Sequence, residues 1–333
     1  MAIRQQGFFA CLFLIFSIAR LEALPSSHVD SRIINGTEVN WNNTRYVVSI
    51  RMAFLDNMIY GAGHMCGGSL IAPDVVLTAA HCIWSENQEK FRSPQEFSVV
   101  VGSLDRTRKD RNTLQFAVKD IIWGPNFDPD TFEDDIAIMI LNQTVPRTYN
   151  EYSLIEMNEN RNLAAGTKCT VSGWGLTEKN LYATKLRSVE VPIVSRSECS
   201  EHYGAENLID GMLCAGYMNG GRDACSADSG GPLVCNDKLV GIVSFGVGCA
   251  MPGYPGIYTD VAYHIDWIRN KTGLKTKEYL QLQNDYFNYT IVPYANNSTG
   301  SSNSTHGSNS STAIFKRSFN FMILILLCIY KTM

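Results

Sequence analysis

Between residues 33 and 257, short runs of aliphatic, β-branched and aromatic residues alternate with Gly, Pro, Asn and Asp. No long amphipathic helix interrupts these runs, so the pattern is typical of a β-sandwich or β-barrel and not of alternating strands and helices. The clearest runs predict strands at 46–50, 75–78, 97–101, 116–122, 136–141, 169–172 and 239–244.

One helix is predicted where this pattern ends. Val261, Ile265 and Ile268 are spaced at i, i+4 and i+7, which places them on one helical face. Gly273 is a suitable stop for this helix. The folded region is therefore expected to span residues 33–273.

The N-terminus carries an apolar run of a different kind. Arg4 precedes apolar residues 8–18, and small residues follow at Ala19 and Ala23. A basic start, a run too short for a bilayer core of about 30 Å, and small residues at its exit predict a secretory signal peptide over 1–23. A buried or membrane helix is the alternative, and cleavage after Ala19 or Ala23 fits equally well.

The C-terminal region changes character twice. Residues 274–318 include a stretch of Asn, Ser, Thr and Gly at 296–312, which predicts a flexible, solvated stalk. The apolar run at 319–330 would rise only about 18 Å as a helix, and small residues lie upstream of it at 307–311. Residues 319–333 are therefore interpreted as a GPI-anchor signal, with attachment at Ser308 or Asn309. A membrane-embedded tail and a secreted soluble product are the alternatives.

Composition excludes several classes of protein. A net charge of −4 gives no support for a nucleic-acid-binding protein. Plentiful aliphatic and aromatic residues exclude a disordered or collagen-like chain. Cys11 lies in the signal peptide and Cys328 in the tail, so eight of the ten cysteines remain. An even number in an oxidising compartment predicts four disulfides, with the pairing open, and the absence of any C-x-x-C pair argues against a metal site.

Nine N-x-S/T sequons agree with secretion, and the cluster beyond residue 287 is the most informative part of the set. The candidate glycosylation sites are Asn35, Asn42, Asn142, Asn270, Asn288, Asn296, Asn297, Asn303 and Asn309.

Three local sequences carry candidate chemistry: LTAAHC at 77–82, DIAI at 135–138 and DSGGP at 228–232. A serine hydroxyl such as that of Ser229 is a weak nucleophile until a base takes its proton. His81 suits that role, and Asp135 can hold its ring in the correct tautomer. The preceding acids, Glu133 and Asp134, are expected to be solvated loop residues.

Together and in this order, the three motifs resemble those of a secreted trypsin-like serine protease of the chymotrypsin family, over residues 33–273. The resemblance implies an all-β fold of two packed six-stranded antiparallel β-barrels with a C-terminal α-helix. It implies a serine endopeptidase without a cofactor or metal, secreted or held at the cell surface. It also implies the disulfides Cys66–Cys82, Cys169–Cys235, Cys199–Cys214 and Cys225–Cys249.

The resemblance places the oxyanion-hole donors at the backbone N–H groups of Ala227 and Ser229. The family has Gly where this chain has Ala227. If the backbone there needs a positive φ, the Cβ costs about 1–2 kcal/mol. We expect activity to survive with an altered rate. A catalytically weak or silent homologue that acts as a binding protein is the alternative, and Ala227 alone favours it.

The same resemblance locates a specificity (S1) pocket with a carboxylate at its base, which favours substrates with Arg or Lys through charge-assisted hydrogen bonds. Phe245 stands where Trp is usual, and Ala224 where Ser is common. The expected pocket residues are Asp223, Ala224, Ser244, Gly246 and Gly256.

Residues 24–32 are expected to be an activation peptide removed by cleavage after Arg32. The new amino group of Ile33 can then pair with Asp228 and order the oxyanion loop. The expected partners are protein or peptide substrates, an activating trypsin-like protease and protein protease inhibitors. The loop at 103–109 is basic where related enzymes bind calcium, so no calcium site is expected. It is interpreted as a solvated face, with a site for acidic partners as the alternative.

Overall fold

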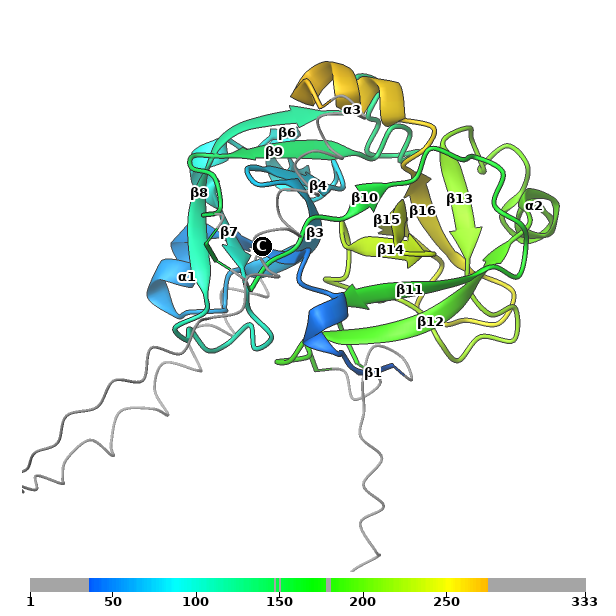
Figure 1. The fold of residues 1–333 in the computed structure, drawn as a ribbon. Helices are drawn as coiled ribbons and strands as arrows, with labels where there is room; N and C mark the ends of the chain where they lie inside the picture. Colours follow the sequence, from blue (N-terminus) through cyan, green and yellow to red (C-terminus); the bar gives the residue numbers. More distant parts are fainter. Residues whose placement is uncertain (1–35, 147, 150, 178–180, 275–333) are drawn as a thin grey trace, which may run out of the picture. The chain divides into compact units, whose positions relative to one another are not determined.

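The computed structural model describes residues 36–146, 148–149, 151–177 and 181–274 (Figure 1). Contacts within the chain divide it into residues 1–291 and 292–333, and all described residues belong to the first unit. The predicted signal peptide, activation peptide, stalk and C-terminal tail lie outside the described residues, as do Arg32, Ile33 and six of the nine sequons. Within the described part, no helix is long and apolar enough to span a membrane.

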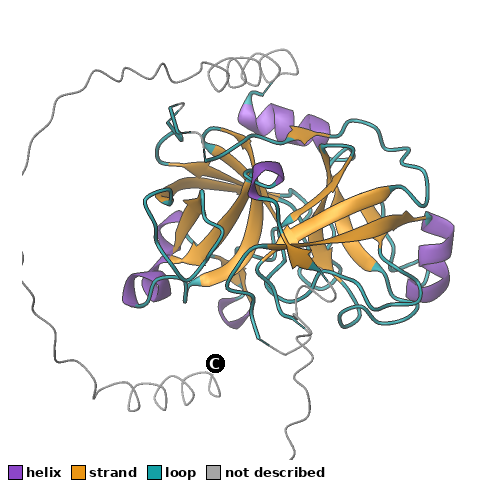
Figure 2. Cartoon of the chain, turned by 60° about the horizontal axis from the view of Figure 1, so that its bottom comes forward, coloured by secondary structure: helices purple, strands orange, loops and turns teal. Residues whose placement is uncertain are grey.

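Strands dominate the described region and helices are short (Figure 2). The strands are β1 Thr37–Glu38, β2 Val47–Met52, β3 His64–Ala72, β4 Val75–Thr78, β5 Trp84–Ser85, β6 Lys90–Phe91, β7 Phe97–Val101, β8 Leu114–Trp123, β9 Ala137–Leu141, β10 Glu156–Met157, β11 Lys168–Gly173, β12 Arg187–Val194, β13 Met212–Ala215, β14 Pro232–Cys235, β15 Lys238–Phe245 and β16 Gly256–Asp260. The helices are α1 Ala53–Met58, α2 Arg196–Tyr203 and α3 Ile265–Thr272, with 3₁₀ turns η1 Trp41–Asn43, η2 Glu86–Gln88 and η3 Pro94–Glu96.

The first barrel closes in the order β2-β3-β4-β9-β8-β7, and each pairing in it is antiparallel. The second closes as β12-β11-β14-β15-β16-β13, because β13 also pairs with β12. Two short strands extend it: β1 lies against β12, and β10 pairs in parallel with β15. The predicted architecture of two six-stranded antiparallel barrels is confirmed.

The seven predicted strands correspond to β2, β4, β7, β8, β9, β11 and β15, with ends that differ by at most a few residues. The predicted C-terminal helix is α3, which starts at Ile265, so Val261 precedes it. Gly273 ends the helix in the left-handed conformation with φ 72°. Glycine tolerates this conformation without the steric cost of a Cβ.

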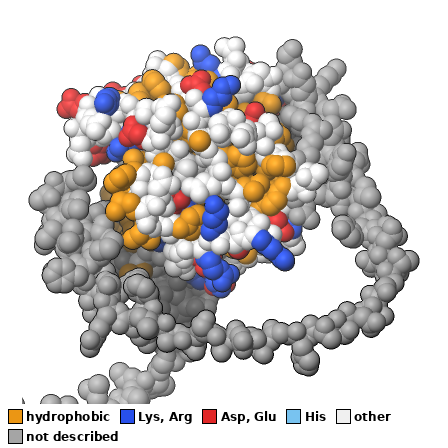
Figure 3. Space-filling view, turned by 90° about the vertical axis from the view of Figure 1, so that its left-hand side faces the viewer, with side chains coloured by type: hydrophobic (Ala, Val, Ile, Leu, Met, Phe, Trp, Pro, Cys, Tyr) orange, Lys and Arg blue, Asp and Glu red, His pale blue; other side chains and the backbone are white. Residues whose placement is uncertain are grey.

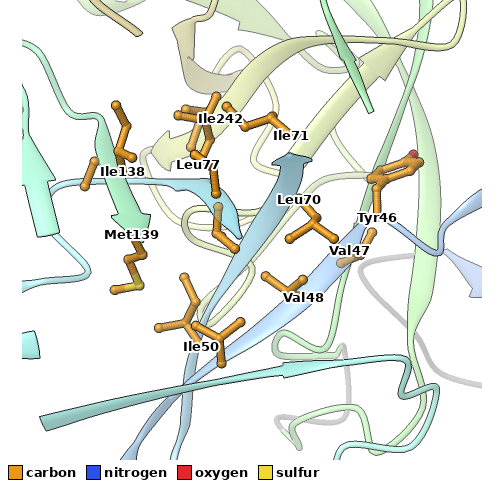
Figure 4. Close-up of a cluster of buried hydrophobic side chains, with 14 of the residues drawn as sticks. Tyr46, Val47, Val48, Ile50, Leu70, Ile71, Leu77, Ile138, Met139 and Ile242 are labelled. Atoms are coloured by element: carbon orange, nitrogen blue, oxygen red, sulfur yellow. The ribbon is translucent and has the colours of Figure 1, made fainter. Parts of the chain in front are cut away.

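The hydrophobic core joins the two barrels. Leu70, Leu77 and Ile138 come from neighbouring strands of the first barrel, and each is fully buried (Figure 4). Ile242 from β15 of the second barrel belongs to the same cluster. Full burial of one such side chain contributes about 1.5–3 kcal/mol, so this shared core fixes the orientation of the barrels whose loops form the site below.

The structure contains the four disulfides that the family resemblance implies. They join Cys66 to Cys82, Cys169 to Cys235, Cys199 to Cys214 and Cys225 to Cys249.

Candidate active site

The three candidate catalytic residues come from both barrels. Thr78 at the end of β4 pairs with Ala137 at the start of β9, so His81 and Asp135 lie at the same end of the first barrel. Ser229 lies in the turn that precedes β14 of the second barrel. Its carbonyl accepts a hydrogen bond from Gly67 of β3 at 2.8 Å, which ties the turn to the first barrel.

His81 and Asp135 are joined by two hydrogen bonds. The His81 backbone N–H donates to Asp135 Oδ1 at 2.8 Å, and the ring Nδ1 lies 2.8 Å from Oδ2. Burial alone raises the pKa of Asp135, but the charge of His81 and the hydrogen bonds outweigh it and lower that pKa. Burial lowers the pKa of His81, and the Asp135 charge more than offsets it, so the His81 pKa is raised. Both shifts favour the charged pair.

The second barrel also fixes Asp135. The Ser244 hydroxyl donates to Asp135 Oδ2 at 2.5 Å, and the Thr259 hydroxyl donates to the Asp135 carbonyl at 2.7 Å. From its sequence motif, Ser244 was predicted only in the pocket wall, and no motif singles out Thr259. These contacts join residues more than 100 positions apart, so no local pattern reveals them.

Ser229 is brought to the loop of His81 by close packing of the next residue. Gly230 has φ 74°, and a Cβ there would lie 2.1 Å from Thr78 Oγ1. Only glycine fits this contact. No hydrogen bond joins Ser229 to His81 in the described part of the chain. Such bonds in ligand-free sites often tighten only when substrate is present.

Ala227 adopts the positive φ that the sequence analysis considered, at 69°. It is half-buried, two residues before Ser229, in the turn that would supply the oxyanion-hole donors. The strain of a left-handed alanine is therefore present at this position.

Asp228 is fully buried beneath the same turn. Its Oδ1 accepts from the Gly175 N–H at 2.8 Å and its Oδ2 from the Cys225 N–H at 3.0 Å. No cationic side chain of the described residues forms an ion pair with it. Burial consequently raises the pKa of Asp228 to about 7.

A pocket of about 200 Å³ opens beside Ser229 and is lined by all five predicted specificity residues. Asp223 is 5% exposed at this pocket. Its Oδ2 accepts from the Ala250 N–H at 2.9 Å, whereas Oδ1 has no partner among the described residues. Burial raises the pKa of Asp223 to about 6. A Cβ at Gly256 would lie 3.0 Å from that free oxygen, so glycine keeps the access open.

The loop before Asp135 contains two residues, Asp134 and Phe132, that make contacts not expected from the sequence. The prediction that Asp134 is solvated was wrong, because its Oδ1 lies 2.9 Å from Nε2 of buried His264. The reason is a contact with the segment before α3, which is distant in sequence. Phe132 places its ring 5.5 Å from that of His81 and 5.1 Å from that of Phe245. An aromatic wall therefore adjoins the candidate triad.

One group of potential metal ligands lies at the site, formed by Cys66, His81 and Cys82. The two cysteines are joined in a disulfide, so they offer no thiolate, and His81 is engaged by Asp135. This chemistry does not fit a metal ion. A larger hollow of about 500 Å³ on the second barrel is lined by none of the predicted catalytic, oxyanion-hole or specificity residues.

Comparison with known proteins gives the family. The family model described as Trypsin matches residues 33–268. Trypsin eta of Drosophila melanogaster is 39% identical over 246 residues, which cover 73% of this chain and 89% of that protein. Trypsin-1 of Astacus astacus is 37% identical over 242 residues (71% and 98%), and the vitellin-degrading protease of Bombyx mori is 38% identical over 276 residues (81% and 98%). With its two antiparallel barrels, the chain thus belongs to the trypsin family and is a serine endopeptidase.

Proposed function

We propose that the enzyme hydrolyses peptide bonds after Arg or Lys in extracellular proteins. The observation that carries this proposal is the Asp223 carboxylate, buried at the pocket beside Ser229 with one oxygen unpaired in the described chain. Burying a carboxylate without a cationic partner is costly, and a guanidinium or ammonium group offsets that cost through charge-assisted hydrogen bonds. The pocket glycines Gly246 and Gly256 leave room for a long side chain.

In the proposed reaction, Ser229 Oγ attacks the substrate carbonyl while His81 Nε2 takes its proton. Asp135 holds the ring through Nδ1 and stabilises the resulting imidazolium. The oxyanion accepts hydrogen bonds from the backbone N–H groups of Ala227 and Ser229. His81 then gives its proton to the departing amine, and water releases the acyl group from Ser229 by the same steps in reverse order.

Latency belongs to the same proposal. Cleavage after Arg32 by another trypsin-like protease frees the amino group of Ile33, which pairs with Asp228. The buried Asp228 carboxylate supports this step, because only two backbone N–H groups of the described chain bond to it and its pKa is raised. An ammonium group beside it favours the ionised form and orders the turn that carries Ala227 and Ser229. Protein inhibitors that fill the pocket are the expected regulators of the active form.

The alternative of a catalytically silent homologue rests on Ala227 alone. His81, Asp135 and Ser229 are all present, and alanine still offers its N–H despite its positive φ. The endopeptidase reading is therefore the one we adopt.

We further propose that the mature enzyme is held at the cell surface by a GPI anchor, with residues 274–318 as its stalk. Secretion is supported by the four disulfides, and Asn42, Asn142 and Asn270 are exposed as glycosylation requires. Phosphatidylinositol-specific phospholipase C should release active enzyme from expressing cells. Retention on the cells, with an epitope after Tyr330 still attached, contradicts the anchor.

The proposed specificity is tested by profiling cleaved peptide mixtures with protein activated at Arg32. We expect Arg or Lys before nearly every cleaved bond, and no cleavage by the Ser229→Ala variant. Comparable cleavage after Leu or Phe by the unaltered enzyme contradicts the assignment.

A further inference from the structure

Helix α1 is inverted with respect to the usual pattern. Its only charged residue, Asp56, is buried, whereas Phe54 is 71% exposed and Met58 57% exposed. Leu55 and Ile59 are also exposed. A surface helix normally turns its apolar side toward the core. Contiguous exposed apolar side chains on a folded protein mark an interaction site.

A buried ion pair holds this inverted orientation. Arg51 of β2 is fully buried and its Nη1 donates to Asp56 Oδ1 at 3.0 Å. Gln115 of β8 donates to the other carboxylate oxygen at 3.0 Å. Turning the apolar residues inward would break the pair, and a buried charge left without its partner costs about 3–5 kcal/mol. Phe54 and Met58 are thus held in solvent.

Arg106 joins the segment after α1 to two further loops. Its Nη1 donates to the Gly61 carbonyl at 2.9 Å, and its Nε donates to the Ala183 carbonyl at 2.8 Å. Its guanidinium lies 6.0 Å from the centre of the Tyr182 ring. The interpretation of this loop as solvated therefore fails at Arg106, which is a structural contact among three loops.

These three loops collect most of the exposed large apolar side chains. Of eleven such residues in the described chain, seven lie on α1 or on these loops: Phe54, Leu55, Met58, Ile59, Leu104, Leu181 and Tyr182. Figure 3 views the side of the molecule that carries α1, where hydrophobic and basic side chains occur on one face. We call the surface of α1, Ile59, Leu104–Arg111 and Tyr182 the docking face.

The charge of the docking face is positive. Arg108, Lys109 and Arg111 are exposed, and none of them is part of an ion pair between described residues. The acids beside them, Asp105 and Asp110, are engaged in local hydrogen bonds to Thr and Asn groups of the same loop. Apolar side chains rimmed by unpaired cations are complementary to a peptide that carries both acidic and bulky apolar residues.

The chain connects the docking face to the cleft on the side away from the specificity pocket. The chain runs from α1 through His64 to Cys66, whose disulfide partner Cys82 has its Sγ 4.0 Å from His81 Nε2. The pocket walls lie on the opposite barrel, beyond Ser229. A substrate chain that is anchored in the pocket and crosses Ser229 would pass this disulfide, from which β3 leads back to α1.

We propose that the docking face binds an acidic, hydrophobic segment of the protein substrate, downstream of the bond that is cut. The inference rests on the proposed function, which it deepens: the pocket selects the residue before the bond, and the docking face selects the protein. Short peptides that lack the segment are cleaved without its help.

The test uses the full-length chain with Ser229→Ala and a synthetic peptide of Asp, Glu, Phe and Leu without Arg or Lys. We expect saturable binding by titration calorimetry. Binding should weaken by at least about tenfold with Phe54→Ser plus Met58→Ser, and similarly with Arg108→Glu plus Lys109→Glu. Two matched controls lie by α3, distant from α1 in Figure 1: Tyr263→Ser for exposed apolar area and Lys271→Glu for charge. Neither should change the dissociation constant.

Altered peptides and lipid vesicles distinguish an acidic, hydrophobic peptide from other ligands of the docking face. Peptides with Asn and Gln for the acids, or with Ser for the apolar residues, should bind weakly. Binding of phosphatidylserine vesicles through the same residues, with no binding of the acidic peptide, overturns the proposal in favour of a membrane contact.

In the catalytic form, which retains Ser229, the docking variants should keep kcat/KM on a short Arg peptide. Loss of that activity in the unaltered enzyme counts against the proposed function, whereas absent probe binding with intact activity counts against the docking face alone.

Discussion

Asp135 holds His81 with both carboxylate oxygens: Oδ1 accepts from the backbone N–H and Oδ2 faces ring Nδ1, each at 2.8 Å. The backbone contact fixes where the residue lies, and the ring contact fixes which nitrogen carries the proton. Nε2 is thereby left to face the substrate side. The Ser244 hydroxyl on Oδ2 adds a contact from the other barrel.

The first prediction concerns the pH dependence of catalysis. The pKa of His81 is raised from its ordinary value of 6.5, and only the neutral ring can accept a proton from Ser229. As pH falls through this raised pKa, kcat/KM should therefore fall, with an apparent pKa above 6.5. Asp135→Asn should lower kcat by about 10⁴-fold at neutral pH because it stabilises the wrong tautomer. Rates on a short Arg peptide check both statements, and unchanged circular dichroism excludes unfolding. A rate that is level down to pH 5 contradicts this role.

The second prediction concerns the specificity pocket. Asp223→Ser should lower kcat/KM for an Arg substrate by about 10⁴-fold and leave the triad geometry intact, because a buried cation then lacks its partner. Asp210→Ser is the control, since Asp210 is an acid with a 79% exposed side chain on the same barrel. In the ligand-free enzyme the pKa of Asp223 is about 6, so benzamidine should bind more weakly as pH falls through that value. Equal binding of benzamidine at pH 5 and pH 8 would contradict the location of the Asp223 carboxylate at the base of the pocket.

Most barrel strands could be predicted from the sequence because each strand is a short, continuous run of apolar residues. β3 is not among the runs that the pattern singles out, since Gly67 and Gly68 interrupt it. In the structure a Cβ at Gly67 would lie 2.9 Å from the Gly231 Cα. The strand therefore needs glycine where another chain segment crosses it, a requirement set by tertiary structure.

The residues of the site also fall into two groups, those that local motifs reveal and those that only tertiary contacts reveal. His81, Asp135, Ser229 and Asp223 lie in short motifs whose chemistry is readable one segment at a time. The Asp134–His264 contact and the α1 inversion depend on segments that meet only after folding. An amphipathic pattern assigns apolar residues to the core, so it assigns α1 the wrong way round unless the Arg51 partner of Asp56 is known.

The third prediction concerns Ala227, whose φ of 69° is strained for any residue with a Cβ. Ala227→Gly should remove a strain of about 1–2 kcal/mol, partly offset by the greater freedom of glycine when unfolded. We expect unchanged or higher kcat/KM and a small rise in Tm. Ala227→Val should lower both, because a β-branched residue is more restricted there. Equal activity of the Val and Gly variants contradicts a left-handed residue in the oxyanion turn.

The fourth prediction concerns latency and is carried by Asp228. Before cleavage its buried carboxyl has a raised pKa of about 7, so ionisation destabilises the folded state as pH rises from 3.8 toward 7. Once the Ile33 ammonium pairs with the Asp228 carboxylate, the folded state no longer loses stability as pH rises over this range. The Tm of the cleaved protein should therefore exceed that of the uncleaved protein near pH 7.5, and the difference should shrink at pH 4. It should also shrink as the α-amino group deprotonates above about pH 8.

The variants for this prediction separate cleavage from ordering. Arg32→Gln should be secreted as a protein that trypsin treatment does not activate. Asp228→Asn should be cut after Arg32 yet stay inactive, because the new amino group finds no charged partner and the turn of Ala227 and Ser229 is not held. Edman sequencing that reads Ile33-Ile34-Asn35 from the inactive Asp228→Asn product confirms the cut. Full activity of Arg32→Gln as secreted shows that the turn is ordered without a free amino group, and the switch is then wrong.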